Sequence, residues 1–133
     1  MVCKILFFNY KDTDKNYFDK NHLDNFCLEF IKDSLNSVTL NSLNNEQFDQ
    51  TVALSINENS QINSEVINKF KNLRVIATRS KSCSHIDLKS CINRNIAVVN
   101  VEDYKPECEY YNINCSFKAI TSVLCGEKTY RII

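Results

Sequence analysis

The sequence predicts one three-layer α/β sandwich around a five-stranded parallel sheet with strand order 2-1-3-4-5. Apolar runs of strand length recur along the chain without polar alternation, which is typical of strands covered on both faces. Amphipathic helical stretches separate the later runs, as in right-handed βαβ units. The chain has 133 residues, 44% of them hydrophobic and 24% charged, so residues 1–133 suit a single domain with a sizeable core.

The first half of the chain supplies three of the predicted strands. Residues 2–8 (VCKILFF), 26–31 (FCLEFI) and 51–56 (TVALSI) are apolar and have strand length. A short helix is expected at residues 14–24, between the first two strands. Residues 38–48 fit no single pattern and are left unassigned.

The second half has the clearer pattern. Two strands are expected at residues 74–78 (RVIAT) and 96–101 (IAVVNV), with a polar turn at 79–84 after the first. The helix before them is predicted to be capped by Asn63 or Ser64. Its apolar face carries Val66, Ile67, Phe70 and Leu73. A second amphipathic helix is indicated by Leu88, Cys91 and Ile92.

The last helix, predicted over residues 106–125, carries two apolar stripes. The first consists of Ile113, Phe117, Ile120 and Leu124. The second consists of Cys108, Tyr111, Cys115 and Ala119. At about 100° per residue these stripes lie on opposite sides of the helix. A helix that is apolar on two sides is buried on both, so we expect the second stripe to contact a second copy, as a homodimer, or a partner domain.

Composition excludes several functions. Sixteen basic residues balance sixteen acidic ones, which gives no electrostatic reason to expect nucleic acid or a membrane as partner. No stretch approaches the length of a membrane span. The single glycine, Gly126, leaves no glycine-rich phosphate loop. Seven cysteines without a C-x-x-C pair predict free thiols in a reducing, cytoplasmic setting, with no metal site.

Residues 66–106 closely resemble the N-terminal, substrate-binding domain of the D-isomer-specific 2-hydroxyacid dehydrogenases. That family has a strand followed by an R-S-A-G-x-x-x-I-D turn and a later V-x-N-V-P-x-Y-S/G-P-E stretch. The matching residues are Arg79-Ser80, Ile86-Asp87, Asn100-Val101, Tyr104, Pro106 and Glu107. The resemblance implies a flavodoxin-like fold. It also implies that a second, Rossmann domain supplies the NAD site and the catalytic arginine, glutamate and histidine.

The resemblance implies a substrate site but no catalytic residue in this chain. His22 and His85 lie outside the position of the family's acid/base, and hydride transfer needs a positioned cofactor. We therefore expect a truncated or stand-alone substrate-binding domain that is inactive alone. A non-catalytic module that binds a small carboxylate or another protein is the alternative. Tyr111 and Asn112 of this chain stand where the family has a Glu-His pair, on the helix that meets the cofactor domain in the family. This departure favours the alternative.

The predicted site is the turn after the fourth strand, where the family holds the substrate carboxylate with backbone N–H groups. The resemblance places this site at Ser80, Lys81 and Ser82, and consecutive amides of this kind can form an anion-binding nest. Ser82 replaces the family's glycine, which predicts a distorted turn. Arg79 and Tyr104 are the further candidates for ligand contact, for a 2-hydroxy or 2-oxo acid.

Two other chemistries fit the sequence less well. A phospho-receiver needs an acceptor aspartate after its third strand, where this chain has Asn57. A nucleophilic thiol at Cys83 is conceivable, because His85 and a helix N-terminus nearby could lower its pKa. No third partner for such a pair is visible in the sequence, so we expect Cys83 to be a partly exposed bystander thiol.

Overall fold

The computed structural model describes residues 3–9, 26–101 and 109–124, with only the backbone described for 109–114. Its sheet has five parallel strands in the order β2-β1-β3-β4-β5, which confirms the predicted fold class and strand order. The strands are β1 (Lys4–Phe8), β2 (Cys27–Ile31), β3 (Thr51–Ile56), β4 (Val75–Thr78) and β5 (Ala97–Asn100). The helix expected at 14–24 falls outside the described residues.

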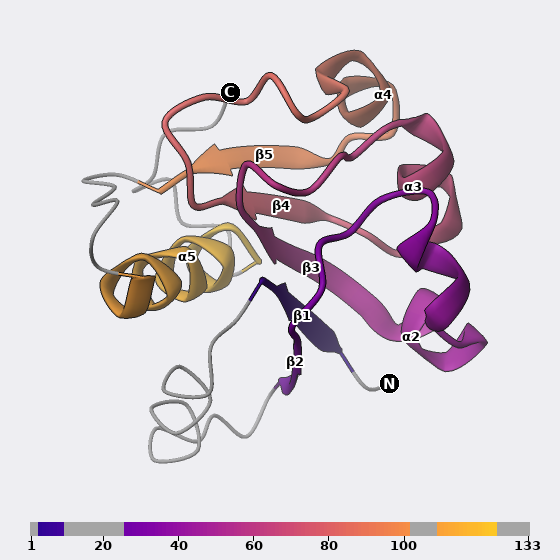
Figure 1. Cartoon of the computed structure of the whole chain (residues 1–133), viewed down its shortest axis with the longest axis horizontal. Helices are drawn as coiled ribbons and strands as arrows, with labels where there is room; N and C mark the ends of the chain where they lie inside the picture. The colour runs from indigo at the N-terminus through magenta and orange to yellow at the C-terminus, as the bar shows by residue number, and fades with distance from the viewer. Residues whose placement is uncertain (1–2, 10–25, 102–108, 125–133) are drawn as a thin grey trace.

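Helices cover both faces of the sheet (Figure 1). One face carries three short helices, α2 (Asn45–Gln50), α3 (Ser64–Lys69) and α4 (Leu88–Asn93). The long helix α5 (Glu109–Leu124) lies on the opposite face (Figure 1). Neighbouring strand residues divide between the two sides, because successive side chains of a strand point to opposite faces. In β1, for example, Leu6 packs with the α3 side and Phe7 with the α5 side.

The helix starts are fixed by their own side chains. Asn63 accepts a hydrogen bond from the backbone N–H of Val66 at 3.0 Å, which confirms one of the two predicted caps of α3. The unassigned segment 38–48 forms a 3-10 helix, η1 (Thr39–Ser42), and the start of α2. Asn44 begins α2 with a capping box to Gln47, so a local hydrogen-bond signal decided this segment where hydrophobic periodicity could not.

One prediction about a helix face is wrong, and another is tested only in part. Ile92 is 68% exposed, because α4 turns Cys91 into the core and the next residue points about 100° away. On α5, Ala119 is fully buried together with Phe117 and Ile120. At this point residues of both predicted stripes belong to the same buried cluster.

Part of the predicted second stripe cannot be compared with the structure. Cys108 lies outside the described residues, and only the backbone of Tyr111 is described; Cys115 is half-buried. The homodimer predicted through this stripe stays a prediction, as does the cytoplasmic location. None of the helices in the described ranges has the length and hydropathy needed to cross a membrane.

Candidate functional site

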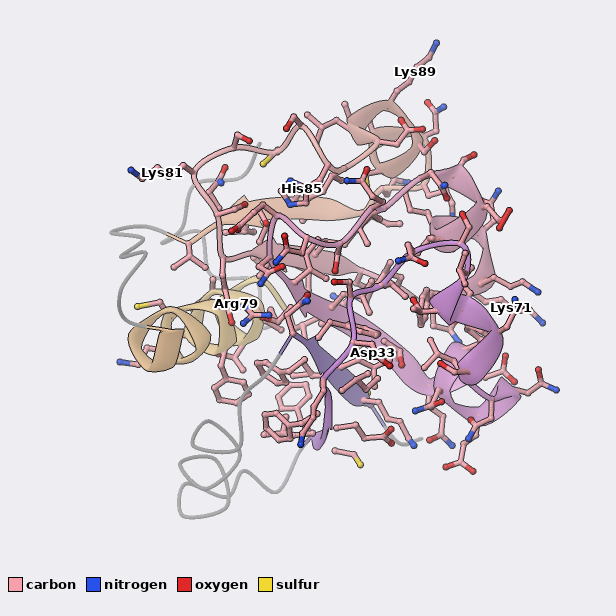
Figure 2. All side chains as sticks on the ribbon, viewed as in Figure 1. Asp33, Lys71, Arg79, Lys81, His85 and Lys89 are labelled. Carbon is pink, nitrogen blue, oxygen red and sulfur yellow. The ribbon has the colours of Figure 1, made fainter. Side chains whose placement is uncertain are left out.

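The predicted site lies at the carboxyl edge of the sheet, where parallel α/β sheets bind their ligands. Arg79 and Ser80 follow β4 and are buried, with Arg79 fully inaccessible to solvent. The Arg79 guanidinium points into the molecule, and its Nη2 donates a hydrogen bond to the carbonyl oxygen of Phe8 at the end of β1 (Figure 2). This contact ties the end of β4 to the end of β1, two positions away in the sheet.

The other half of the predicted turn faces solvent. Lys81 and Ser82 are exposed, and the Lys81 side chain extends away from the domain (Figure 2). The backbone N–H groups of Lys81, Ser82 and Cys83 donate no hydrogen bond to any other residue that the structure describes. Three consecutive amides that find no acceptor among the described residues form a surface that can receive an anion.

Two carbonyl groups of this turn are held from the protein side. Asn100 Nδ2 donates to the carbonyl oxygen of Ser80 at 3.0 Å, and Ser80 Oγ donates to the carbonyl oxygen of Ser82 at 2.8 Å. A trans peptide is planar, and its C=O and N–H point in opposite directions. Holding these two oxygens therefore turns the N–H groups of Lys81 and Cys83 away from the hydrogen-bonding partners.

Ser82 at the family's glycine position does not strain the backbone. Among the described residues that are not glycine, only Asn9 and Asn95 have a positive φ, of 59° and 57°. The left-handed conformation that favours glycine is thus absent at Ser82. The exposed side chain that serine adds at this position has its Oγ 3.3 Å from Ser84 Oγ. The predicted distortion of the turn therefore does not take the form of a positive φ at Ser82.

A chain of hydrogen bonds supports the turn from behind. Thr78 Oγ1 lies 2.6 Å from Ser80 Oγ and 2.8 Å from His85 Nε2, and all three residues are buried. Burial lowers the pKa of His85, although the nearby charge of Glu58 raises it in part. The imidazole is therefore neutral over a wider pH range than a histidine in water. His85, Asp87 and Asn63 also line a pocket of ≈ 210 Å³ on the side of α3 and α4.

Asn100 is the residue that sequence reasoning undervalued. It matched a family position, but no role was assigned to it. In the sheet it is the parallel partner of Thr78, which places its amide beside the turn after β4. Its Oδ1 also accepts a hydrogen bond from Cys83 Sγ at 3.3 Å. The only available signal was the polar residue that ends an otherwise apolar strand.

The surroundings of Cys83 favour a bystander thiol over a nucleophile. Burial raises the pKa of its thiol, and the hydrogen bond to Asn100 lowers it by less. His85 directs its Nε2 to Thr78 instead of the thiol. A protonated, half-buried thiol is a poor nucleophile, since the thiolate is the reactive form. Tyr104, the remaining candidate for substrate contact, lies outside the described residues.

The starts of α3 and α4 do not fit the pyrophosphate of a dinucleotide. A pyrophosphate is normally bound where a glycine-rich loop opens a helix with free N–H groups. Here Asn63 and Asp87 occupy the starts of α3 and α4 and accept from Val66 and Ser90. Asp87 also places a negative charge at that point. Within the ranges that the structure describes, no three His, Cys, Asp or Glu side chains are grouped to hold a metal ion.

These features define an α/β domain whose polar loops meet at the carboxyl edge of a parallel sheet. The family described as D-isomer specific 2-hydroxyacid dehydrogenase, catalytic domain, matches residues 5–108. This match covers most of the chain, and the protein belongs to that family. A search of curated proteins gave no match.

Solved structures agree with this assignment. The apo structure of D-lactate dehydrogenase from Escherichia coli superposes with a TM-score of 0.62 at 26% identity, covering 79% of this chain and 33% of that one. The Salmonella D-lactate dehydrogenase gives 0.61 at 26% identity, with 79% and 31% covered. D-lactate dehydrogenase from Aquifex aeolicus, solved with NAD and lactic acid, gives 0.64 at 22% identity, with 89% and 33% covered. The chain thus spans about a third of the length of these enzymes.

Proposed function

We propose that this domain binds the carboxylate of a small 2-hydroxy or 2-oxo acid at the backbone N–H groups of Lys81, Ser82 and Cys83. It does so as the substrate-binding part of an NAD-dependent dehydrogenase. The observation that carries this proposal is the row of three backbone N–H groups that donate to no described residue. Two of them are oriented because the carbonyl oxygen of the same peptide accepts a hydrogen bond from within the domain. The family membership and the position at the carboxyl edge of the sheet support it.

Lys81 adds charge to a site that is built from the backbone. Its ammonium group is exposed and extends from the same turn, so it attracts an anion without a fixed geometry (Figure 2). An exposed charge is screened by water and salt and contributes little. The backbone amides are therefore proposed to provide the specificity for a carboxylate, and Lys81 a smaller, salt-dependent increase in affinity.

The test is an amide chemical-shift titration of the whole chain with pyruvate and D-lactate. Saturable shifts are expected at Ser80 to Ser84, and pyruvamide, which lacks the carboxylate, is expected to leave these signals unchanged. Lys81→Met should weaken binding only a fewfold, and less at high salt. The matched control is Lys89→Met, which removes an exposed lysine from α4 and should have no effect (Figure 2).

Ser82→Gly tests the substitution that separates this chain from its family. Because the backbone at Ser82 already has a negative φ, glycine is not needed for the conformation. Removing the Cβ should open the approach to the amides and tighten pyruvate binding. Equal shifts with pyruvate and pyruvamide, or shifts confined to residues outside this turn, would refute the proposed carboxylate site.

We further propose that this chain does not reduce a 2-oxo acid by itself. The described helix starts are occupied by Asn63 and Asp87, and hydride transfer requires a bound nicotinamide beside the substrate. The NAD site would come from another domain or chain. Following the loss of NADH absorbance in the presence of pyruvate tests this, and turnover above the protein-free rate would refute it.

A further inference from the structure

We propose that Thr78 and His85 are positioning residues for the carboxylate-binding turn, acting through Ser80. This proposal rests on the proposed function, because it explains how the amides of that same site are oriented. Neither residue is placed to touch the ligand. Each acts through the next hydrogen bond, and the chain ends on the carbonyl group of Ser82.

The direction of the chain follows from counting protons. Ser80 has one hydroxyl proton and donates it to the carbonyl oxygen of Ser82. Its contact with Thr78 must then be a bond that Thr78 donates. The single hydroxyl proton of Thr78 is thereby used in the bond to Ser80. Thr78 Oγ1 must therefore accept its other hydrogen bond from His85 Nε2–H.

This count fixes the tautomer of neutral His85. The proton resides on Nε2, and Nδ1 carries the lone pair. Donors run in one sequence from His85 through Thr78 and Ser80 to the carbonyl oxygen of Ser82. The opposite tautomer would place a lone pair against Thr78, and the threonine would then have to donate to the histidine instead of the serine.

The consequence for the site lies in one peptide plane. Ser80 holds the carbonyl oxygen of Ser82, so it also orients the N–H of Cys83, which belongs to the same planar peptide. If Thr78 stops donating, Ser80 is free to turn its hydroxyl toward other partners. The peptide between Ser82 and Cys83 then loses its fixed orientation, and one of the proposed anion donors is no longer preorganised.

Variants of Thr78 separate the hydroxyl group from the shape of the side chain. Thr78→Val keeps a β-branched side chain of nearly the same size and removes the hydroxyl, whereas Thr78→Ser keeps it. We expect Thr78→Val to weaken pyruvate binding roughly fivefold, the effect of one net hydrogen bond. Thr78→Ser should bind like the unchanged protein.

The matched control is Thr51→Val. Thr51 is also fully buried on a strand of the same sheet, and its Oγ1 donates to the carbonyl oxygen of Gln47 at 2.6 Å. It begins β3 at the amino edge, away from the turn. Thr51→Val should lower the free energy of unfolding by about as much as Thr78→Val does. It should leave pyruvate binding unchanged.

A second measurement on the unchanged protein does not depend on any Thr78 variant folding. The nitrogen chemical shifts of the two histidines report the tautomer of each, and His22→Gln assigns them. Neutral His85 is expected to carry its proton on Nε2. A proton on Nδ1 would overturn the proposal, as would Thr78→Val binding pyruvate as tightly as the unchanged protein.

The outcomes distinguish the two proposals. Unchanged protein that binds no acid refutes the proposed function, and the positioning role falls with it. Unchanged protein that binds pyruvate, together with a Thr78→Val variant that binds it equally well, refutes only the positioning role. Weak binding by both Thr78→Val and Thr78→Ser also overturns it, because the hydroxyl would then not be the group that matters.

Discussion

Replacing Asn100 by alanine tests how firmly the turn after β4 is held. The change removes the donor to the carbonyl oxygen of Ser80, 3.0 Å away, and the acceptor for Cys83 Sγ, 3.3 Å away. Ser80 is only 3% exposed, so its carbonyl group gains little from water in exchange. A buried carbonyl left unsatisfied costs about 1–3 kcal/mol, and the thiol is a weak donor that adds little. We expect a loss of about 2 kcal/mol.

Urea unfolding measures this loss. With a slope of about 2 kcal/mol per molar urea, the midpoint of Asn100→Ala should fall by about 1 M. Asn41→Ala, at an exposed position in η1, should stay within about 0.5 kcal/mol of the unchanged protein.

Asn100→Asp separates the donor from the shape of the side chain. At neutral pH it sets a carboxylate oxygen against the Ser80 carbonyl and should cost at least as much as alanine. In acid the introduced carboxyl group is protonated and can donate, so its deficit relative to the unchanged protein should shrink. If alanine leaves the midpoint unchanged, or aspartate is as stable as asparagine at neutral pH, Asn100 does not hold the turn.

Three further predictions concern stability and thiol reactivity. Burial lowers the pKa of His85, so the unfolded chain binds a proton at this histidine more readily than the folded one. The free energy of unfolding should therefore decline as the pH falls below 6.5 and level off beneath the folded-state pKa. His85→Gln should remove this decline from unfolding curves recorded across a pH series. Cys27 is exposed, whereas burial raises the pKa of Cys91 to about 11, so mass-spectrometric mapping after brief alkylation should find Cys27 modified and Cys91 intact unless the protein unfolds first. Lys4 at the start of β1 forms an ion pair with Glu29 of β2. Lys4→Met should cost about 1–2 kcal/mol in chemical denaturation, less than the loss of a fully buried pair because the Glu29 side chain is 27% exposed, and adding Glu29→Leu should recover most of this loss.

The strands were predictable because a strand buried on both faces is apolar at successive positions, which is visible in the sequence. Residues 51–56 are apolar or small throughout, and the structure forms β3 with the same bounds. The start of α3 was predictable for a local reason, since Asn63 needs only the backbone three residues ahead. Segment 38–48 was not, because α2 buries none of its residues fully and depends on its cap.

The candidate site was predictable only as a location. Family resemblance placed it at Ser80 to Ser82, but the groups that hold the turn are distant in sequence. Asn100 comes twenty residues after Ser80 in the sequence. It reaches Ser80 because β4 and β5 are paired in a register that sets Thr78 opposite Asn100. A sequence pattern carries the order of strands, yet the register between them follows from packing across the whole sheet.

Ser82 shows how a residue-by-residue comparison can mislead. Glycine can serve two purposes in such a turn, a positive φ and room for a ligand, and the sequence alone cannot separate them. The structure separates the two purposes. Ser82 has no positive φ, yet its side chain adds atoms to the turn whose N–H groups donate to no described residue. The backbone conformation can therefore persist without glycine when Asn100 and Ser80 hold the carbonyl groups from behind. What the serine changes is the space in front of the turn, so its effect should fall on which acids fit there.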